Sequence, residues 1–262
     1  MRCIDFHTHA FPDSLAARAV PALEQEGGIK AVLDGTLSAL LASMDAAGIE
    51  RSVVCSIATK PDQFDAIMKW SRAVASARIV PMPSIHPADP LAVARVGAVA
   101  AAGFKGIKLH PYYQNFFIDS PEATALLEAI ASHGLLCVCH TGFDIAFPRE
   151  RRADPAKIAA LLARMPDLKL VTTHLGAWQD WEEVDRHLLG KPIYMETSFA
   201  CGYLDGREVA RMLQTHPAEY LLFGSDSPWK DQAESRDALR ALGLGEDLER
   251  RLFYANAEKL LA

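Results

Sequence analysis

The chain begins with the run RCIDFHTH at residues 2–9, in which a short apolar stretch ends in two histidines. Seven further runs of similar length are rich in apolar or β-branched residues, which is typical of buried strands. They start at Ser52, Ile79, Lys105, Leu135, Leu168, Ile193 and Tyr220, and segments with helical spacing separate them. Eight strand–helix units in 262 residues predict an α/β fold of the (β/α)8 TIM-barrel type. An open, doubly wound sheet is the alternative, which the count of eight disfavours.

The spacing of these strands indicates an insertion in the first unit. The first two strands start about 50 residues apart, whereas later strands start about 28 residues apart on average. The excess of about 22 residues falls around Ala10–Leu33, after the first strand, on the face where barrels build their active sites. We expect this segment to cover part of a pocket; a surface excursion is the alternative. Since no linker or shift in composition interrupts the chain, residues 1–262 are expected to form a single domain.

The composition restricts the partners. Half of the residues are apolar and 23% are charged, and 33 acidic against 27 basic side chains give a formal charge of −6. This balance disfavours nucleic acid and anionic membranes as partners, and we expect the partner to be a small-molecule substrate. The five cysteines show no CxxC spacing, so neither a zinc ribbon nor a disulfide framework is indicated. With no signal-peptide pattern and no apolar run of about 18 residues, we expect a cytoplasmic protein.

Polar residues with metal-binding chemistry lie where several predicted strands end. His7 and His9 end the first strand and are two residues apart, so their imidazoles should point to the same face. His140, His174 and Asp226 end the fifth, sixth and eighth strands. The carboxyl ends of barrel strands share one rim, so these five side chains should converge. Imidazoles and a carboxylate suit Zn²⁺ and related divalent ions, and the sequence therefore predicts a metal site.

The same residues carry a resemblance to a known family. In order along the chain, the motifs DFHTHAFP, CHTG, LVTTHLG and FGSDSPW resemble the amidohydrolase superfamily. The most similar branch is the amidohydrolase 2 group, which includes aminocarboxymuconate-semialdehyde decarboxylase. The resemblance implies a metal-dependent enzyme with one divalent ion, usually zinc, held by His7, His9, His140 and Asp226. It also implies that His174 acts beside the metal as a base or polarising group, and relatives of this kind are often homodimers.

Lys108 leaves a second metal arrangement open. Binuclear relatives place a carboxylated lysine or a glutamate on the fourth strand, which here contains GIKLHP at residues 106–111. A second ion bound through modified Lys108 and His174 is therefore an alternative to the single ion that we favour. Without a metal role, Lys108 is expected to form a buried ion pair with Glu196, because charges inside an apolar barrel should be paired.

The expected reaction is hydrolysis of a C–N or ester/lactone bond in a small, acidic molecule. A divalent ion lowers the pKa of a bound water, so that hydroxide is available near neutral pH. Asp226 would accept the proton and His174 would polarise the scissile carbonyl. The alternative within the same family is a lyase, namely a non-oxidative decarboxylase or hydratase. Release of CO₂ would distinguish the decarboxylase.

Two further classes are less favoured. A TatD-like nuclease shares the opening HxH strand, but the GEIGLD glutamate of that family is absent here and the net charge is negative. A barrel that keeps its metal for structure alone would leave His174 without a role.

The sequence gives less specific predictions for the remaining polar and aromatic residues. His86 and His110 could reach the pocket, and so could four aromatic residues that follow strands: Tyr112, Tyr113, Phe143 and Trp229. The arginine-rich segment at residues 149–152 is expected to be a solvated loop; its alternative role is to clamp a substrate anion. Cys137 and Cys139 have the opposite parity to His140 and should face the helices. His133, His187 and His216 are expected at the surface.

Overall fold

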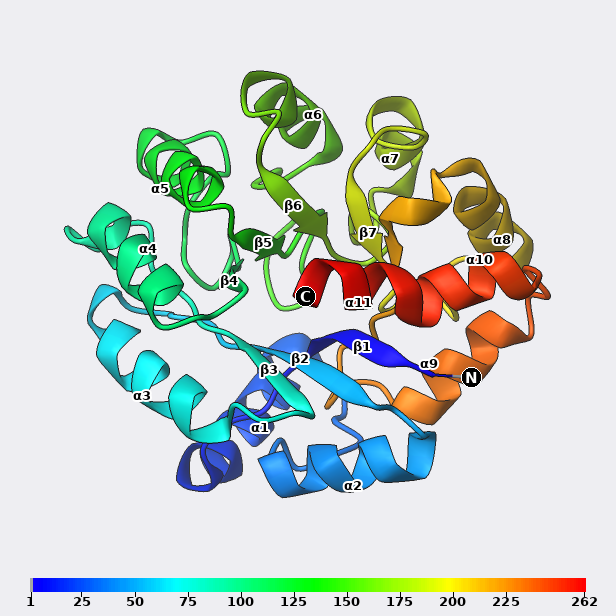
Figure 1. Ribbon diagram of the computed structural model, residues 1–262, viewed down its shortest axis with the longest axis horizontal. Coiled ribbons are helices and arrows are strands. Elements are labelled where there is room, and N and C mark those ends of the chain that lie inside the picture. Colours follow the sequence, from blue (N-terminus) through cyan, green and yellow to red (C-terminus); the bar gives the residue numbers. More distant parts are fainter. Residues whose placement is uncertain (1) are drawn as a thin grey trace.

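The computed structural model describes residues 2–262, and Figure 1 shows their strands arranged around a common axis inside a ring of helices. All strand pairs are parallel. The strands are β1 (Ile4–Thr8), β2 (Arg51–Cys55), β3 (Ile79–Met82), β4 (Gly106–Leu109), β5 (Leu136–Cys139), β6 (Lys169–Thr172), β7 (Tyr194–Glu196) and β8 (Leu221–Leu222). Each of the eight coincides with a predicted run.

Two short contacts close the ring. The ladders run β1-β2-β3 and β4-β5-β6-β7-β8. A parallel bridge between Ser84 and Lys108 joins β3 to β4, and another between Thr8 and Ser227 joins the segment after β8 to β1. The Phe6 amide also donates to the Phe223 carbonyl at 2.8 Å. The predicted (β/α)8 architecture is therefore confirmed.

The helices follow the strands in chain order. They are α1 (Asp13–Gly27), α2 (Leu37–Ala47), α3 (Phe64–Val74), α4 (Ala92–Ala101), α5 (Pro121–Ser132), α6 (Pro155–Arg164), α7 (Trp181–His187), α8 (Gly206–Thr215), α9 (Gln232–Arg240), α10 (Glu246–Arg250) and α11 (Asn256–Leu261). The start of α5 shows why these segments are helical: Ser120 accepts a hydrogen bond from the Ala123 amide, and Pro121 occupies the first turn. Asp154 and Pro155 begin α6 in the same way. None of the helices in residues 2–262 is long and apolar enough to cross a bilayer.

The apolar side chains form two cores. One fills the barrel with residues such as Ile4, Phe6 and Val138, and it includes Ala257 and Leu261 of α11. Figure 1 shows α11 lying across one end of the barrel. The second core lies between strands and helices and contains Cys137 and Cys139, as their parity predicts. Because α11 covers the amino-terminal end of the strands, the open end is the one that carries the predicted metal ligands.

The insertion after β1 is the helix α1. Its ends are anchored: Phe11 forms a parallel bridge with Thr36, and the Val32 amide donates to the Pro228 carbonyl at 2.8 Å. The segment is thus held beside the open end of the barrel.

The predicted surface position of His216 is wrong. This side chain, which follows α8, is buried, with Nε2 lying 2.8 Å from the Ile193 carbonyl and Nδ1 accepting from the Gly190 amide at 3.3 Å. Burial lowers its pKa. His216 therefore fixes the turn before β7 as a neutral imidazole.

Candidate metal centre

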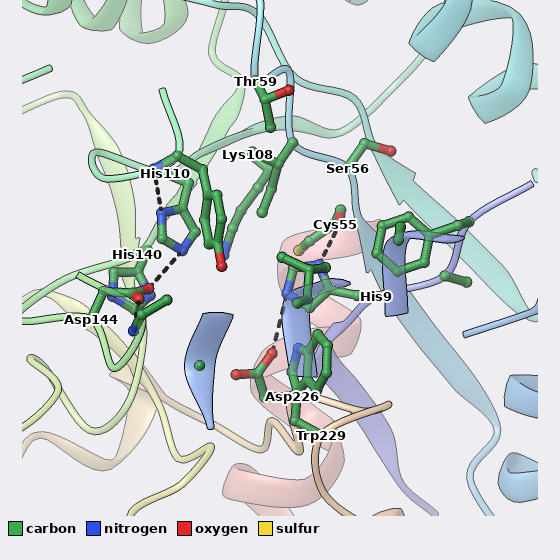
Figure 2. Close-up of a pocket in the computed structure, with 18 of the residues that line it drawn as sticks. His9, Cys55, Ser56, Thr59, Lys108, His110, His140, Asp144, Asp226 and Trp229 are labelled. Atoms are coloured by element: carbon green, nitrogen blue, oxygen red, sulfur yellow. Dashed lines mark hydrogen bonds and ion pairs between the residues drawn. The ribbon is translucent and has the colours of Figure 1, made fainter. Parts of the chain in front are cut away.

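A cavity of about 640 Å³ opens at the carboxyl ends of the strands, and Figure 2 shows the side chains that line it. All five predicted site residues line this cavity: His7, His9, His140, His174 and Asp226. Each is at most 9% exposed, so they form the floor of the cavity and not its rim. The structure thus brings together every residue of the predicted site.

His7 and His9 direct one nitrogen each to the same point. Nδ1 of His7 lies 3.0 Å from Glu196 Oε1, and Nδ1 of His9 lies 2.8 Å from the Cys55 carbonyl oxygen. Both partners accept hydrogen bonds, so each Nδ1 carries the proton and each Nε2 keeps its lone pair. The two Nε2 atoms are 3.1 Å apart. Two acceptors at this distance repel each other unless a cation or a proton lies between them.

His140 and His174 are fixed in the same manner. His140 Nε2 donates to the Phe143 carbonyl at 2.8 Å, which leaves Nδ1 as the acceptor. His174 Nδ1 lies 2.9 Å from Ser198 Oγ, whose own hydrogen is donated to Glu196 Oε1. His174 Nδ1 is therefore the donor, and its free Nε2 lies 3.1 Å from His140 Nδ1. Four imidazoles thus present lone pairs to the floor.

Asp226 completes the donor set. Its Oδ1 is buried without a hydrogen-bond partner, 3.1 Å from His9 Nε2 and 3.5 Å from His7 Nε2. Ligand atoms of His7, His174 and Asp226 all lie within 4.8 Å of one another. The backbone of Asp226 has a φ of 63°, and its amide donates to the His7 carbonyl at 2.8 Å. A strained residue with an unsatisfied buried oxygen is typical of a ligand site.

The electrostatics of the floor fit a divalent cation. Burial lowers the pKa of His7, His140 and His174, so these rings are neutral. Burial opposes ionisation of Asp226, but the contacts with His7 and His9 and the nearby Lys108 outweigh it, and its pKa is lowered. Neutral imidazoles and an ionised carboxylate are the protonation states that metal binding requires. Their nitrogen and oxygen donors suit several divalent first-row ions.

Glu196 orients two of these rings. Its Oε1 faces His7 Nδ1 and accepts from the His174 amide at 2.9 Å, while Oε2 accepts from the Ser198 amide at 2.7 Å. The close packing depends on Gly224, where a Cβ atom would lie only 2.0 Å from Glu196 Oε2. Carboxylates that hold the second nitrogen of a metal-binding histidine fix its tautomer and orientation.

The expected ion pair between Lys108 and Glu196 is wrong. Glu196 is occupied by the donors just described, and Lys108 forms no ion pair within residues 2–262. The Lys108 side chain is fully buried, and its Nζ lies 3.1 Å from His7 Nε2. Figure 2 shows Lys108 reaching down between His110 and His9. A buried ammonium group without a carboxylate partner is unfavourable, so Lys108 is suited to meet an anionic ligand.

A second group of ligating side chains adjoins the first. His110 Nε2 and His140 Nε2 lie 3.4 and 3.6 Å from Asp144 Oδ2, and the two imidazole rings stack with centroids 4.1 Å apart. His110 therefore reaches the cavity, whereas His86 does not line it and accepts from the Ala88 amide. The sequence analysis missed Asp144, because a single aspartate in the loop after β5 has no distinctive pattern.

The loop after β5 lines the cavity with Asp144, Ile145 and Ala146, but its arginine-rich part does not. Tyr113 and Trp229 line the cavity, but Tyr112 and Phe143 do not. The three arginines of residues 149–152 have intramolecular partners: Arg149 binds Gln179, Arg151 binds Asp180, and Arg152 binds Glu150. None of the three arginines lines the cavity. The segment therefore fits the expected solvated loop better than a clamp for a substrate anion.

The insertion and α3 supply walls that the sequence analysis did not identify individually. The cavity is lined by Leu15, Ala19 and Leu23 of α1 and by Ala66, Ile67 and Trp70 of α3. The expectation that the segment Ala10–Leu33 covers part of a pocket is confirmed.

Comparison with known proteins gives a family and a set of similar folds. The family model described as Amidohydrolase matches residues 4–262. No curated protein matches the chain. An uncharacterized TIM-barrel protein from Bordetella bronchiseptica is similar in structure, with a TM-score of 0.77, 20% identity, and coverage of 100% of this chain and 98% of that chain.

The similar structures with assigned activities include two decarboxylases from different organisms. The 2,6-dihydroxybenzoate decarboxylase from Rhizobium has a TM-score of 0.68 and 16% identity, with 100% of this chain and 99% of that chain covered. The 5-carboxyvanillate decarboxylase from Novosphingobium aromaticivorans was solved with manganese and 4-hydroxy-3-methoxy-5-nitrobenzoic acid. It has a TM-score of 0.71 and 15% identity, and the match covers 99% of this chain and 96% of that chain.

Proposed function

Since the chain belongs to the amidohydrolase family over residues 4–262, we propose that it is a metal-dependent decarboxylase that removes the carboxyl group of a hydroxylated aromatic acid without oxidation. The observation that carries this proposal is the convergence of four imidazole lone pairs and the unsatisfied Asp226 Oδ1 at the floor of a largely apolar cavity.

The floor offers a complete set of ligands. His7, His9, His140 and Asp226 would hold one divalent ion, and His174 would remain beside it. When bound, such an ion acts as a Lewis acid that holds substrate oxygens and withdraws electrons from the reacting carbon. The Lys108 ammonium lines the same floor and would oppose the negative charge of the substrate.

The side chains of the floor would also supply the proton. Decarboxylation breaks the bond between the ring carbon and the carboxyl carbon, releases CO₂, and places a proton on the ring carbon in its stead. Asp226 and His174 are the candidate donors, because both line the cavity beside the other ligands. The hydroxyl group of the substrate can provide the proton that one of them passes to the ring.

The walls favour a lyase over the hydrolase that the sequence analysis ranks first. Among the aromatic side chains that line the cavity, four could enclose a ring: Tyr113, Trp178, Phe199 and Trp229. Loss of CO₂ replaces a localised carboxylate charge by neutral CO₂ and a charge spread over the ring, which apolar walls favour, whereas a hydrolase must also stabilise a polar leaving group. The two similar structures described above are both decarboxylases, which supports the same choice.

The test is to load the protein with Zn²⁺ or Mn²⁺ and to incubate it with benzoic acids that carry a hydroxyl group next to the carboxyl group. We expect CO₂ release, and in D₂O a product with deuterium at the carbon that lost the carboxyl group. Asp226→Asn should abolish turnover, and metal analysis should find about one ion per chain. Incorporation of oxygen-18 from labelled water into ester, lactone or amide substrates, without CO₂ release, would instead establish a hydrolase.

A further inference from the structure

We infer that the space between α1 and α3 binds an apolar extension of the substrate, so that the substrate is a monoanionic acid with an apolar body larger than one aromatic ring. We call this space the apolar chamber and define it by six residues: Leu15, Ala19, Leu23, Ala66, Ile67 and Trp70. The inference rests on the proposed function, because it places the carboxylate of the substrate at the cavity floor.

The chamber is formed by matched helix faces. Leu15, Ala19 and Leu23 are four residues apart along α1 and therefore lie on one face of that helix. Ala66 and Trp70 are likewise four residues apart on α3. The other apolar face of α1, with Ala16 and Val20, is buried. The face toward the chamber is thus not needed for packing of the helix itself.

The apolar side chains of the cavity remain partly exposed to solvent. Leu15 is 41% exposed, and Ile145, which also lines the cavity, is 50% exposed. Large apolar side chains gathered around one hollow, and not scattered singly, mark a binding surface. A ligand that covers them would gain the free energy of removing apolar area from water.

The size of the cavity exceeds what a benzoate requires. A cavity of roughly 150 Å³ is sufficient for a benzene molecule. The cavity measured here is about 640 Å³, so one ring at the floor leaves the chamber unfilled. This volume accommodates an alkyl chain or a further ring on the side of the substrate away from the carboxyl group.

The charges along the cavity define the polarity of the ligand. Lys108 is the one lysine or arginine among the lining residues of the described chain, and it lies at the floor. Glu26, on the last turn of α1, is the charged residue at the chamber end. A second carboxylate on the extension would therefore meet a like charge and no cation, which disfavours a dicarboxylic acid.

The experiment measures binding by isothermal titration calorimetry with metal-loaded protein and unreactive 4-alkylbenzoates, from benzoate to 4-hexylbenzoate. Because these probes lack the hydroxyl group, the readout is independent of turnover. We expect Kd to fall by about fourfold for each added methylene until the chamber is filled. Replacing the terminal methyl group by a carboxylate should weaken binding by about tenfold.

Substitutions on α1 and α3 test whether the alkyl chain of the probe binds in the apolar chamber. Ala19→Trp and Ala66→Trp fill the chamber from α1 and from α3, and each should remove the dependence of Kd on alkyl length. Ala17→Trp is the matched control, because Ala17 is exposed on α1 and does not line the cavity. If Kd is independent of alkyl length, or if Ala17→Trp acts like Ala19→Trp, the inference is wrong. Length-dependent binding without any decarboxylation would instead refute only the proposed function.

Discussion

Replacing Glu196 by Gln tests whether the second nitrogen of His7 must be held for the metal to bind. The Glu196 carboxylate receives contacts from His7 Nδ1, from the Ser198 hydroxyl and from the backbone amides of His174 and Ser198. An amide has only one oxygen, so in either orientation its NH₂ group faces at least one of these donors. The buried donor that loses its acceptor costs about 1–3 kcal/mol of stability.

Glu196→Gln should weaken metal binding more than a substitution at the protein surface does. Loss of a carboxylate that orients a ligating histidine weakens metal binding about 10–100-fold, which corresponds to about 1.4–2.7 kcal/mol. The assay is competition for Zn²⁺ against a chelating dye, together with urea unfolding in the presence of a chelator. Glu50→Gln is the matched control, because Glu50 pairs with Arg2 on the surface. Unchanged zinc affinity in Glu196→Gln would refute the argument that Glu196 fixes the tautomer of His7.

Two further substitutions test the packing and the ionisation of buried groups. Gly224→Ala places a Cβ atom 2.0 Å from Glu196 Oε2 and should destabilise the fold by about 1–3 kcal/mol in thermal or urea unfolding; Gly97→Ala in α4 meets only an ordinary contact at 3.5 Å and serves as its control. Equal stability of the two variants would contradict the close approach. Burial lowers the pKa of His216, so the unfolded chain binds the proton more tightly and stability is lost as the pH falls below about 6.5. His216→Asn should show a shallower loss of stability in urea unfolding between neutral and mildly acidic pH, and parallel profiles would show that His216 does not titrate as described.

The sequence predicts the barrel and the site well because both depend on local patterns. Each strand is a short apolar run, and in a parallel barrel the residue after the run lies at one common rim. His140, His174 and Asp226 therefore converge irrespective of the details of packing. Alternation of side chains along an extended strand does not by itself explain the positions of His7 and His9. Phe6 should then point the opposite way, yet it also lies in the barrel interior. The pairing register of β1 shifts between Asp5 and Thr8, and this irregularity allows Phe6 and the two histidines all to point inward.

What the sequence could not predict depends on contacts between distant segments. The expected ion pair between Lys108 and Glu196 is predicted from charge alone. It does not form, because the Glu196 carboxylate accepts hydrogen bonds from three other residues. Asp144 reaches His110 only through the path of the loop after β5. Phe143 packs against the Arg149 guanidinium, 3.9 Å from the ring centroid, and so faces away from the cavity. The conformation of the loops determines which partner each of these side chains contacts, and a single sequence gives little information about loop conformation.

The position of α1 has a consequence for how this barrel can acquire new specificities. The helix contributes side chains to the cavity wall, yet none of the four imidazoles, Asp226 or Lys108 belongs to it. One contiguous segment of 15 residues can therefore be exchanged while these floor side chains keep their positions. Selection for a different ligand, in nature or in a directed library, could act on this helix while the floor of the cavity stays constant.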